Sequence, residues 1–267
     1  MTELHGWRLL PYHRGASDFH FALANELLQN IVVPSLWWHS ADRPTVIVGA
    51  GQRWEPSPGA PISSPEIDIV RRRAGGTAVY ATPDVLGLDV ALPARHQLAI
   101  SDIVEAYRWL GEVWVRATQM LGVASRLISV SEARESALET GPNTQVVRAA
   151  CFGSLSPYEV AVGQRKLVGL AQVRRRSGVL LQSALHLHFD ADALGALLGG
   201  NDCERVACAL RQTALGLDEA AVGSWGQTDV MEAVHEALRQ LHGVFLEPAD
   251  WPVEELLRAE KEVAAAR

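Results

Sequence analysis

The chain has 267 residues, of which 48% are hydrophobic, and its formal net charge is −7. This length allows one large domain with a sizeable core, and the negative charge disfavours general binding to a nucleic-acid backbone. No window approaches the roughly 20 apolar residues needed to span a bilayer, so we expect a cytoplasmic protein without membrane association.

The cysteines and one histidine pair are candidate metal ligands in this sequence. The three cysteines, Cys151, Cys203 and Cys208, form no C-x-x-C pair of the kind that holds zinc or a redox disulfide. We therefore expect free thiols, with Cys203 and Cys208 in structural positions. His186 and His188 alternate on one predicted strand and share a face, but no carboxylate or cysteine ligand lies nearby. Packing is the favoured interpretation, and we expect no metal.

Two short arginine clusters stand out, at residues 71–73 and 174–176. Each has two interpretations that the sequence leaves open. The arginines are either solvated charges on a loop or strand edge, or they dock an anionic substrate or an acidic carrier protein.

The first elements in chain order are a helix and a strand. Residues 17–31 carry a broad apolar stripe, which predicts a helix with Ser17 as its N-cap. The β-branched run that begins at Thr45 predicts a strand. A loop is predicted after it because prolines cluster there, at Pro56, Pro58, Pro61 and Pro65.

Residues 67–92 predict consecutive strands joined by a tight turn at Gly75-Gly76, since a glycine pair readily supplies positive φ angles. Apolar residues at helical spacing predict a helix over 101–122 that opens on Ser101. The polar segment 132–145 ends in a turn signal and predicts a loop.

The segment 146–189 predicts successive strands, with turns at 156–157, 163–164 and 177–178. This would place Cys151 and Lys166 on adjacent strands. The remaining patterns are helical, at 191–200, 203–215, 230–243 and in the charged tail. Strands grouped together with helices on both sides predict an α/β (α+β) fold, a sheet core covered by helices.

Three features of this segment and the glycine turn could carry chemistry. Lys166 enters an apolar strand, where burying its charge is costly unless the charge is used; an edge-strand or snorkelling lysine is the alternative. A free cysteine such as Cys151 is usually a small core residue. The Gly75-Gly76 pair is either a simple turn or a place where a ligand approaches backbone N–H groups.

These residues resemble the lipoate–biotin protein ligase/transferase superfamily (lipoate-protein ligase A-like), closest to its cysteine-dependent octanoyltransferase branch. The first motif, R-R-x-x-G-G-x-x-V, is matched by Arg71, Arg72, Gly75, Gly76 and Val79. The second is matched by Cys151, Phe152, Tyr158, Glu159, Arg165, Lys166, Gly169, Ala171 and Gln172. Weaker similarity covers nearly the whole chain.

The resemblance implies a biotin/lipoate ligase-like catalytic domain over residues 1–250 and a charged helical tail over 251–267. Its sheet would be mixed and largely antiparallel, flanked by helices, and would enclose a tunnel for a medium-length acyl chain. The expected activity is transfer of an octanoyl or lipoyl group through a thioester, with no cofactor.

The resemblance also implies roles for single residues. Cys151 would be the nucleophile, and Lys166 would contact the acyl carbonyl; if the two side chains meet, the ammonium would lower the thiol pKa. Substrate-binding positions would be Arg72, Gly75, Gly76, Val79, Gly169, Ala171 and Gln172. Acyl carrier protein would be the donor. A lysine of a lipoyl-domain protein, such as glycine cleavage H protein or 2-oxoacid dehydrogenase E2, would be the acceptor.

The chain departs from the family pattern at several positions. The positions are Thr77, Ala81, Ser183, Ala184, Ala24 and Asn25; Ala81 and Ser183 stand where histidines are usual. Two further functions therefore stay open. One is an ATP-dependent lipoate-protein ligase that uses magnesium and forms an acyl-adenylate, and the other is a non-catalytic acyl-binding homologue.

Overall fold

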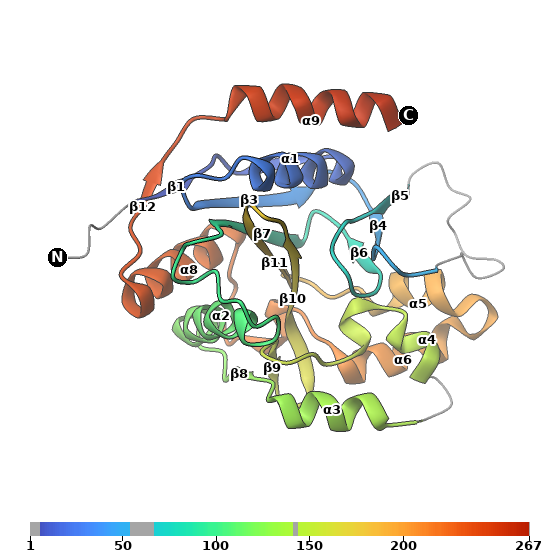
Figure 1. Ribbon diagram of the computed structural model, residues 1–267. Coiled ribbons are helices and arrows are strands. Elements are labelled where there is room, and N and C mark those ends of the chain that lie inside the picture. The colour runs from blue at the N-terminus through green and yellow to red at the C-terminus, as the bar shows by residue number, and fades with distance from the viewer. Residues whose placement is uncertain (1–5, 54–66, 141–143, 267) are drawn as a thin grey trace.

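A nine-stranded mixed sheet forms the centre of the computed structural model, which describes residues 6–53, 67–140 and 144–266 (Figure 1). The strand order is β12-β1-β3-β7-β11-β10-β9-β8, and β2 pairs with β3. Its strands are β1 (Trp7–Leu9), β2 (His13–Gly15), β3 (Ser35–Ala41), β7 (Val85–Pro93), β8 (Arg126–Leu127), β9 (Val160–Val162), β10 (Arg165–Arg174), β11 (Gly178–His186) and β12 (Leu246–Pro248).

Pairing within this sheet is antiparallel from β3 through β7, β11, β10 and β9 to β8. The pairs of β1 with β12, β1 with β3, and β2 with β3 are parallel. The predicted sheet, mixed and largely antiparallel, is confirmed.

A second sheet has three strands in the order β5-β4-β6, and they are β4 (Thr45–Val48), β5 (Asp68–Arg71) and β6 (Val79–Ala81). The central strand β4 pairs in parallel with β5 and antiparallel with β6. The tight turn predicted at Gly75-Gly76 between neighbouring strands is therefore wrong. Residues 72–78 connect β5 to β6, and β4 lies between these two strands in the sheet. The prediction of a proline-rich loop falls on residues 54–66, outside the described residues.

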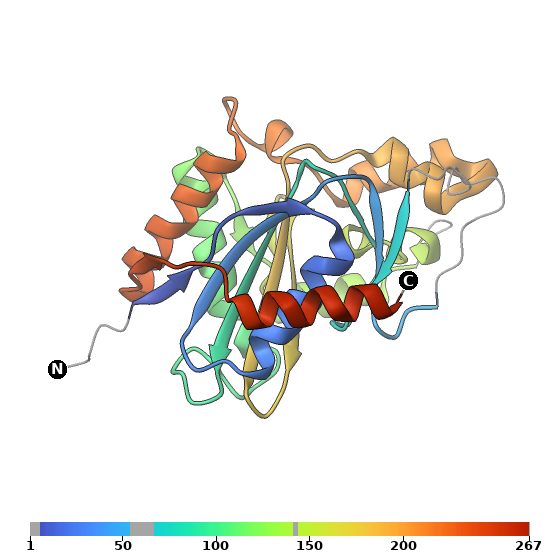
Figure 2. The same ribbon diagram turned by 90° about the horizontal axis from the view of Figure 1, so that it is seen from above.

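Helices cover both faces of the large sheet. They are α1 (Ser17–Gln29), α2 (Arg108–Met120), α3 (Val130–Leu138), α4 (Thr144–Arg148), α5 (Ala191–Gly199), α6 (Cys203–Thr213), α7 (Leu217–Ala220), α8 (Gln227–His242) and α9 (Val253–Ala266). In Figures 1 and 2, α9 lies along α1 on one face, while α2 and α8 lie on the other. Among these described helices, none has the length and apolar composition required to cross a membrane.

The two faces of the sheet differ in the size of their side chains, as the period of two along a strand allows. On β7, Leu86, Leu88 and Val90 are fully buried against α2 and α8. The alternate positions Gly87 and Asp89 face the side that α1 covers, together with small residues of β10 and β11. Large side chains fill one layer, and small ones leave space in the other.

Two predicted helix starts are wrong. Helix α1 is capped by Ala16 without a side-chain bond, because Ser17 is buried as the first helical residue. Helix α2 begins at Arg108, after a 3-10 turn at Glu105–Tyr107. The carboxylate of Asp102 accepts bonds from the N–H groups of residues 104 and 105 and holds the preceding segment in a turn.

The polar segment 132–145 was predicted as a loop, and this is also wrong. Helix α3 occupies its first half, since Ser129 and Glu132 form a reciprocal capping box that satisfies the first N–H groups of the helix. Helix α4 follows at residue 144. The predicted strand around Cys151 is instead a 3-10 turn, Cys151–Gly153, so Cys151 and Lys166 do not lie on adjacent strands. The predicted turn positions at 163–164 and 177–178 do separate β9, β10 and β11.

We expect Ala259→Leu to destabilise the protein. Ala259 is completely buried between α9 and α1, and inserting a larger side chain into a packed contact costs about 1–3 kcal/mol. Chemical denaturation would measure the free energy of unfolding. Ala264→Leu is the matched control, because Ala264 is on the same helix and exposed; equal stability of the two variants would contradict the packing of α9 on α1.

Candidate functional site

Two adjoining cavities meet at the end of the 3-10 turn that holds Cys151. The inner cavity, about 80 Å³, lies between the sheet and α1 and is lined by Phe21, His39, Val79, Ala81, Asp89 and Gln182, among others. The outer cavity, about 410 Å³, is lined by Gly75, Gly76, Tyr107, Lys166 and Gln172, among others. Four residues line both: Arg72, Cys151, Leu170 and Ala171.

Lys166 is in direct contact with the backbone of Cys151. Its ammonium donates to the main-chain carbonyl of Cys151 at 2.7 Å and pairs with the carboxylate of Glu159 at 2.6 Å. An ammonium has three N–H donors, and these two contacts use two of them. The third is left for a ligand in the outer cavity, which Lys166 lines.

The contact between the two predicted catalytic residues is thus through the backbone. The hydrogen bond from Lys166 to the carbonyl fixes the position of residue 151. The expectation that the ammonium lowers the thiol pKa stays a prediction, since the recorded bond goes to the carbonyl oxygen.

Glu159 is the partner that makes burial of Lys166 possible. The side chains of Lys166 and Glu159 are only 1% and 2% exposed, and an unpaired charge at such depth would be very costly. The Glu159 carboxylate also accepts bonds from the N–H groups of Ser156 and Leu170. Burial raises the pKa of Glu159 above its ordinary value, against the opposing effect of Lys166. The sequence matched Glu159 to the motif but did not assign it to the site. The signal that could have placed it there is that a buried lysine such as Lys166 needs a buried carboxylate as its partner.

The turn that carries Cys151 is hydrogen-bonded to the residue that precedes β6. The N–H of Cys151 donates to the carbonyl of Ala78 at 2.7 Å, and the N–H of Ala78 donates to the carbonyl of Ala149 at 3.0 Å. On the other side, the guanidinium of Arg148 donates to the carbonyls of Ser136 and Glu139. Cys151 is half-buried and lies where the inner cavity opens into the outer one.

Arg72 lies at the same junction and is buried. One of its terminal nitrogens donates to the carbonyls of Gly75 and Thr77, which ties down the glycine loop. Gly76 is required there: its φ is 94°, and a Cβ would lie 2.7 Å from the Arg72 guanidinium. The Nε of Arg72 is buried without a hydrogen-bond partner among the described residues, so it can donate to a ligand.

The neighbouring arginines have other partners. Arg71 donates to the carbonyls of Gly49 and Gln52, and Arg73 pairs with Glu262 on α9. In the second cluster, Arg174 donates to the carbonyl of Ile100. Of these arginines, Arg72 is the one that lines both cavities.

The other predicted substrate-binding residues divide between the cavities. Val79 and Gly169 line the inner one, Gly75, Gly76 and Gln172 the outer one, and Ala171 both. Gln172 donates to the carbonyl of Ile103 at 2.6 Å and so holds the segment before α2 against β10.

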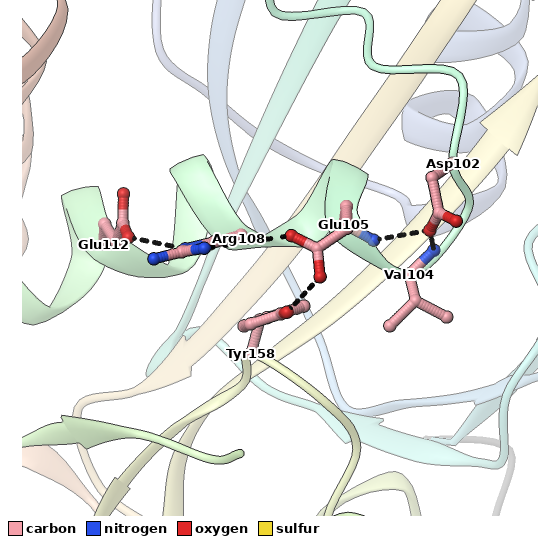
Figure 3. A network of polar contacts seen from close by, with 6 residues as sticks. All are labelled: Asp102, Val104, Glu105, Arg108, Glu112 and Tyr158. Atoms are coloured by element: carbon pink, nitrogen blue, oxygen red, sulfur yellow. Dashed lines mark hydrogen bonds and ion pairs between the residues drawn. The ribbon is translucent and has the colours of Figure 1, made fainter. Parts of the chain in front are cut away.

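A polar network fixes the rim of the outer cavity (Figure 3). The hydroxyl of Tyr158 donates to Glu105, which lies within reach of Arg108, and Arg108 also pairs with Glu112 at 3.0 Å. Tyr158 adopts a positive φ of 65°, a conformation that few residues other than glycine adopt. The turn that bears Glu159 is therefore fastened to the segment in front of α2.

The predicted packing role is confirmed for His186 and wrong for His188, which does not share the strand. His186 is buried with its ring against Phe152 at 4.4 Å between centroids, and burial lowers its pKa to about 4. His188 lies beyond the strand, exposed, and pairs with Asp218. Across residues 6–53, 67–140 and 144–266, no group of three or more His, Cys, Asp or Glu side chains is placed to hold a metal ion.

Two departures from the family pattern are explained by their surroundings. Ala81 belongs to a small apolar cluster with Ala41, Ile47 and Val79, against which Cys151 packs. Ser183 is buried on β11, and its hydroxyl accepts a bond from the indole of Trp114 at 2.9 Å. Neither position contributes an ionisable group to the cavities.

Comparison with known proteins identifies the family of the chain. The family described as "Lipoyl protein ligase A/B catalytic domain" matches residues 17–239. The chain belongs to this family. Similar proteins include an Octanoyltransferase LipM from Kyrpidia tusciae, 31% identical over 97% of this chain and 95% of that protein. A second LipM, from Brevibacillus brevis, is 25% identical over 96% of the chain and 94% of its own length.

Solved structures of the family share the fold. A bi-partite lipoate protein ligase from Thermoplasma acidophilum superimposes with a TM-score of 0.75 at 19% identity, over 97% of this chain and 92% of that one. Lipoate-protein ligase A bound with ATP gives a TM-score of 0.73 at 18% identity, over 96% and 93%. At this level of identity the likeness extends to the architecture of the fold.

We expect Glu159→Ala to cost about 3–5 kcal/mol in the free energy of unfolding, because it leaves the buried Lys166 without its counter-charge. Glu159→Gln keeps the shape and an acceptor oxygen and should cost less. Denaturant unfolding monitored by tryptophan fluorescence would measure both. Glu232→Ala on the exposed face of α8 is the control, and a Glu159→Ala protein as stable as that control would contradict the pairing.

Proposed function

We propose that the chain is an acyltransferase that moves an octanoyl or lipoyl group, by way of a thioester on Cys151, to a lysine of a lipoyl-domain protein. The observation that carries this proposal is the position of Cys151 at the junction of the two cavities, with its carbonyl bound by Lys166. An acyl chain in the inner cavity would have its carbonyl carbon at this junction.

The chemistry runs in two balanced steps. The sulfur of Cys151 attacks the carbonyl of a thioester donor; a new S–C bond forms, the donor's S–C bond breaks, and the proton of Cys151 ends on the donor's thiol. The amine of the acceptor lysine then attacks the acyl-enzyme, an amide forms, and Cys151 regains a proton as its thiol. Covalent catalysis divides one difficult step into two easier ones.

Cationic groups at the junction would stabilise the oxyanion that develops in each step. The third N–H of Lys166 and the free Nε of Arg72 are both donors that the protein itself leaves available. Donors fixed in place before the reaction are the most effective way to stabilise such charge. The pairing of Lys166 with Glu159 holds its ammonium in one position.

The partners follow from the same geometry and from the family. A thioester donor such as octanoyl acyl carrier protein needs no ATP, and the outer cavity is the larger space for the arm that bears the thioester. The acceptor would be a lipoyl-domain lysine; one of the similar structures is described as a ligase together with "its E2 lipoyl domain". No metal or nucleotide takes part in either step.

The test is formation of the acyl-enzyme. Purified protein would be mixed with octanoyl acyl carrier protein without ATP, and its intact mass recorded. We expect an octanoyl adduct that hydroxylamine removes, and we expect Cys151→Ala to abolish it. Cys208→Ala is the matched control, since Cys208 is an exposed free thiol on α6 that lines neither cavity; it should form the adduct at the rate of the unaltered chain.

Two other results would contradict the proposal. Amide product that appears only with free octanoate, ATP and magnesium, and that persists in Cys151→Ala, would identify an ATP-dependent ligase. Absence of adduct and product under both conditions would leave an acyl-binding protein without catalytic activity.

A further inference from the structure

Part of the lining of the inner cavity is polar, although most of it is apolar. His20, His39, Asp89 and Gln182 all line it. An alkyl chain needs only apolar contacts, so a buried carboxylate at this place requires an explanation.

Asp89 is incompletely bonded. Its side chain is 4% exposed, and one carboxylate oxygen, Oδ1, accepts from the amide of Gln182 at 3.0 Å. The other oxygen, Oδ2, is buried and has no hydrogen-bond partner among the described residues, and the same is true of Nε2 of His39. These two atoms are 3.6 Å apart, which is too long for a hydrogen bond.

The fold makes room for this pair. Gly87 lies opposite His39 in the pairing of β7 with β3, and a Cβ at Gly87 would lie 2.4 Å from the His39 ring. The ring of His39 is held between those of His20 and Trp37, at 4.6 and 5.0 Å between centroids. His20 in turn is hydrogen-bonded to His13 at 3.0 Å.

His20, which also lines this part of the cavity, provides no counter-charge for Asp89. Burial, with the neighbouring His39 and His13, lowers the pKa of His20 to about 2, so its ring is uncharged. Among the ion pairs of the described residues, the contact of Asp89 is with His39 alone. A hydrocarbon end placed against Oδ2 would leave a buried carboxylate oxygen without a donor, which is unfavourable.

The depth of Asp89 matches the reach of a medium-length acyl chain. Ala171, at the junction, pairs with Gln182, and Gln182 pairs with Asp89. Two strand spacings amount to roughly 10 Å. Three bonds of an extended chain span about 3.3–3.6 Å, so this distance corresponds to about eight or nine bonds.

We infer that the inner cavity selects an acyl group with a hydroxyl near its far end over an unsubstituted hydrocarbon chain, and that Oδ2 of Asp89 and Nε2 of His39 bind this hydroxyl. A hydroxyl both donates and accepts, so it can donate to Oδ2 of Asp89 and also bond to Nε2 of His39. The inference rests on the proposed function for the reacting end of the chain at Cys151, and it specifies the class of acyl group.

Binding to the inert Cys151→Ala protein tests the inference apart from catalysis. The protein would be titrated by calorimetry with two N-acetylcysteamine thioesters that differ in one atom, octanoyl and ω-hydroxyoctanoyl. A hydrogen bond to a charged group corresponds to a difference of about tenfold or more in Kd. We therefore expect the hydroxyacyl compound to bind at least about tenfold more tightly.

Asp89→Asn in the same protein is the decisive variant. It keeps the shape and an oxygen for Gln182 but replaces the free acceptor with an NH₂ group, so the preference for the hydroxyl should be lost. Asp84→Asn, at an exposed aspartate on the turn before β7, is the control and should keep the preference.

Equal binding of the two thioesters, or tighter binding of octanoyl, would overturn the inference and would mean that solvent satisfies Asp89. The proposed function is judged separately, by the octanoyl adduct on Cys151. An adduct without a hydroxyl preference would leave the transferase and remove the inference. A preference for the hydroxyl without any adduct would leave the inference about the cavity and remove the transferase.

Discussion

A single buried ion pair determines how the catalytic region is built. Lys166 lies within a strand and Glu159 after a turn, and each is tolerated at its depth only because the other is there. Each of them also bonds to the backbone, Lys166 to the carbonyl of Cys151 and Glu159 to the N–H groups of residues 156 and 170. The pair thus connects the cysteine turn, β10 and the Tyr158 turn, which are separate segments of the chain.

Most of the sheet architecture was predictable, because it depends on local patterns and on the family resemblance. Alternating apolar residues marked β7, β10 and β11, and strong helical periodicity marked α1, α2 and α8. The failures came where tertiary contacts decide. Cys151 has strand-like neighbours but lies in a 3-10 turn, because its N–H bonds to the carbonyl of Ala78, which is distant in the sequence and directly precedes β6. Such a tertiary contact overrides local propensity. Likewise β4 separates β5 from β6, a choice of partner that no glycine pair encodes.

The site was predictable in its residues and less so in its contacts. Arg72, Cys151 and Lys166 do come together, as the motifs indicated. The hydrogen bond from Lys166 to the carbonyl of Cys151 could not be predicted from the sequence, because it depends on how two separate segments approach each other. The polar wall around Asp89 lay outside every motif. His39 and Asp89 lie on strands with an ordinary alternating pattern. Only the cross-strand register shows that Gly87 lies opposite His39 and, without a Cβ, leaves room for the His39 ring.

The packing around the inner cavity also bears on the order in which parts of the structure become available during synthesis. Trp251 packs edge-on against Trp37 and against His13, each at 5.8 Å between ring centroids. Strand β12 joins the sheet beside β1, and α9 closes over α1. All of these contacts use residues beyond 245, which leave the ribosome after every other element described here. The strands and the turn that line the two cavities therefore precede, in the order of synthesis, the segment that packs against Trp37 and His13.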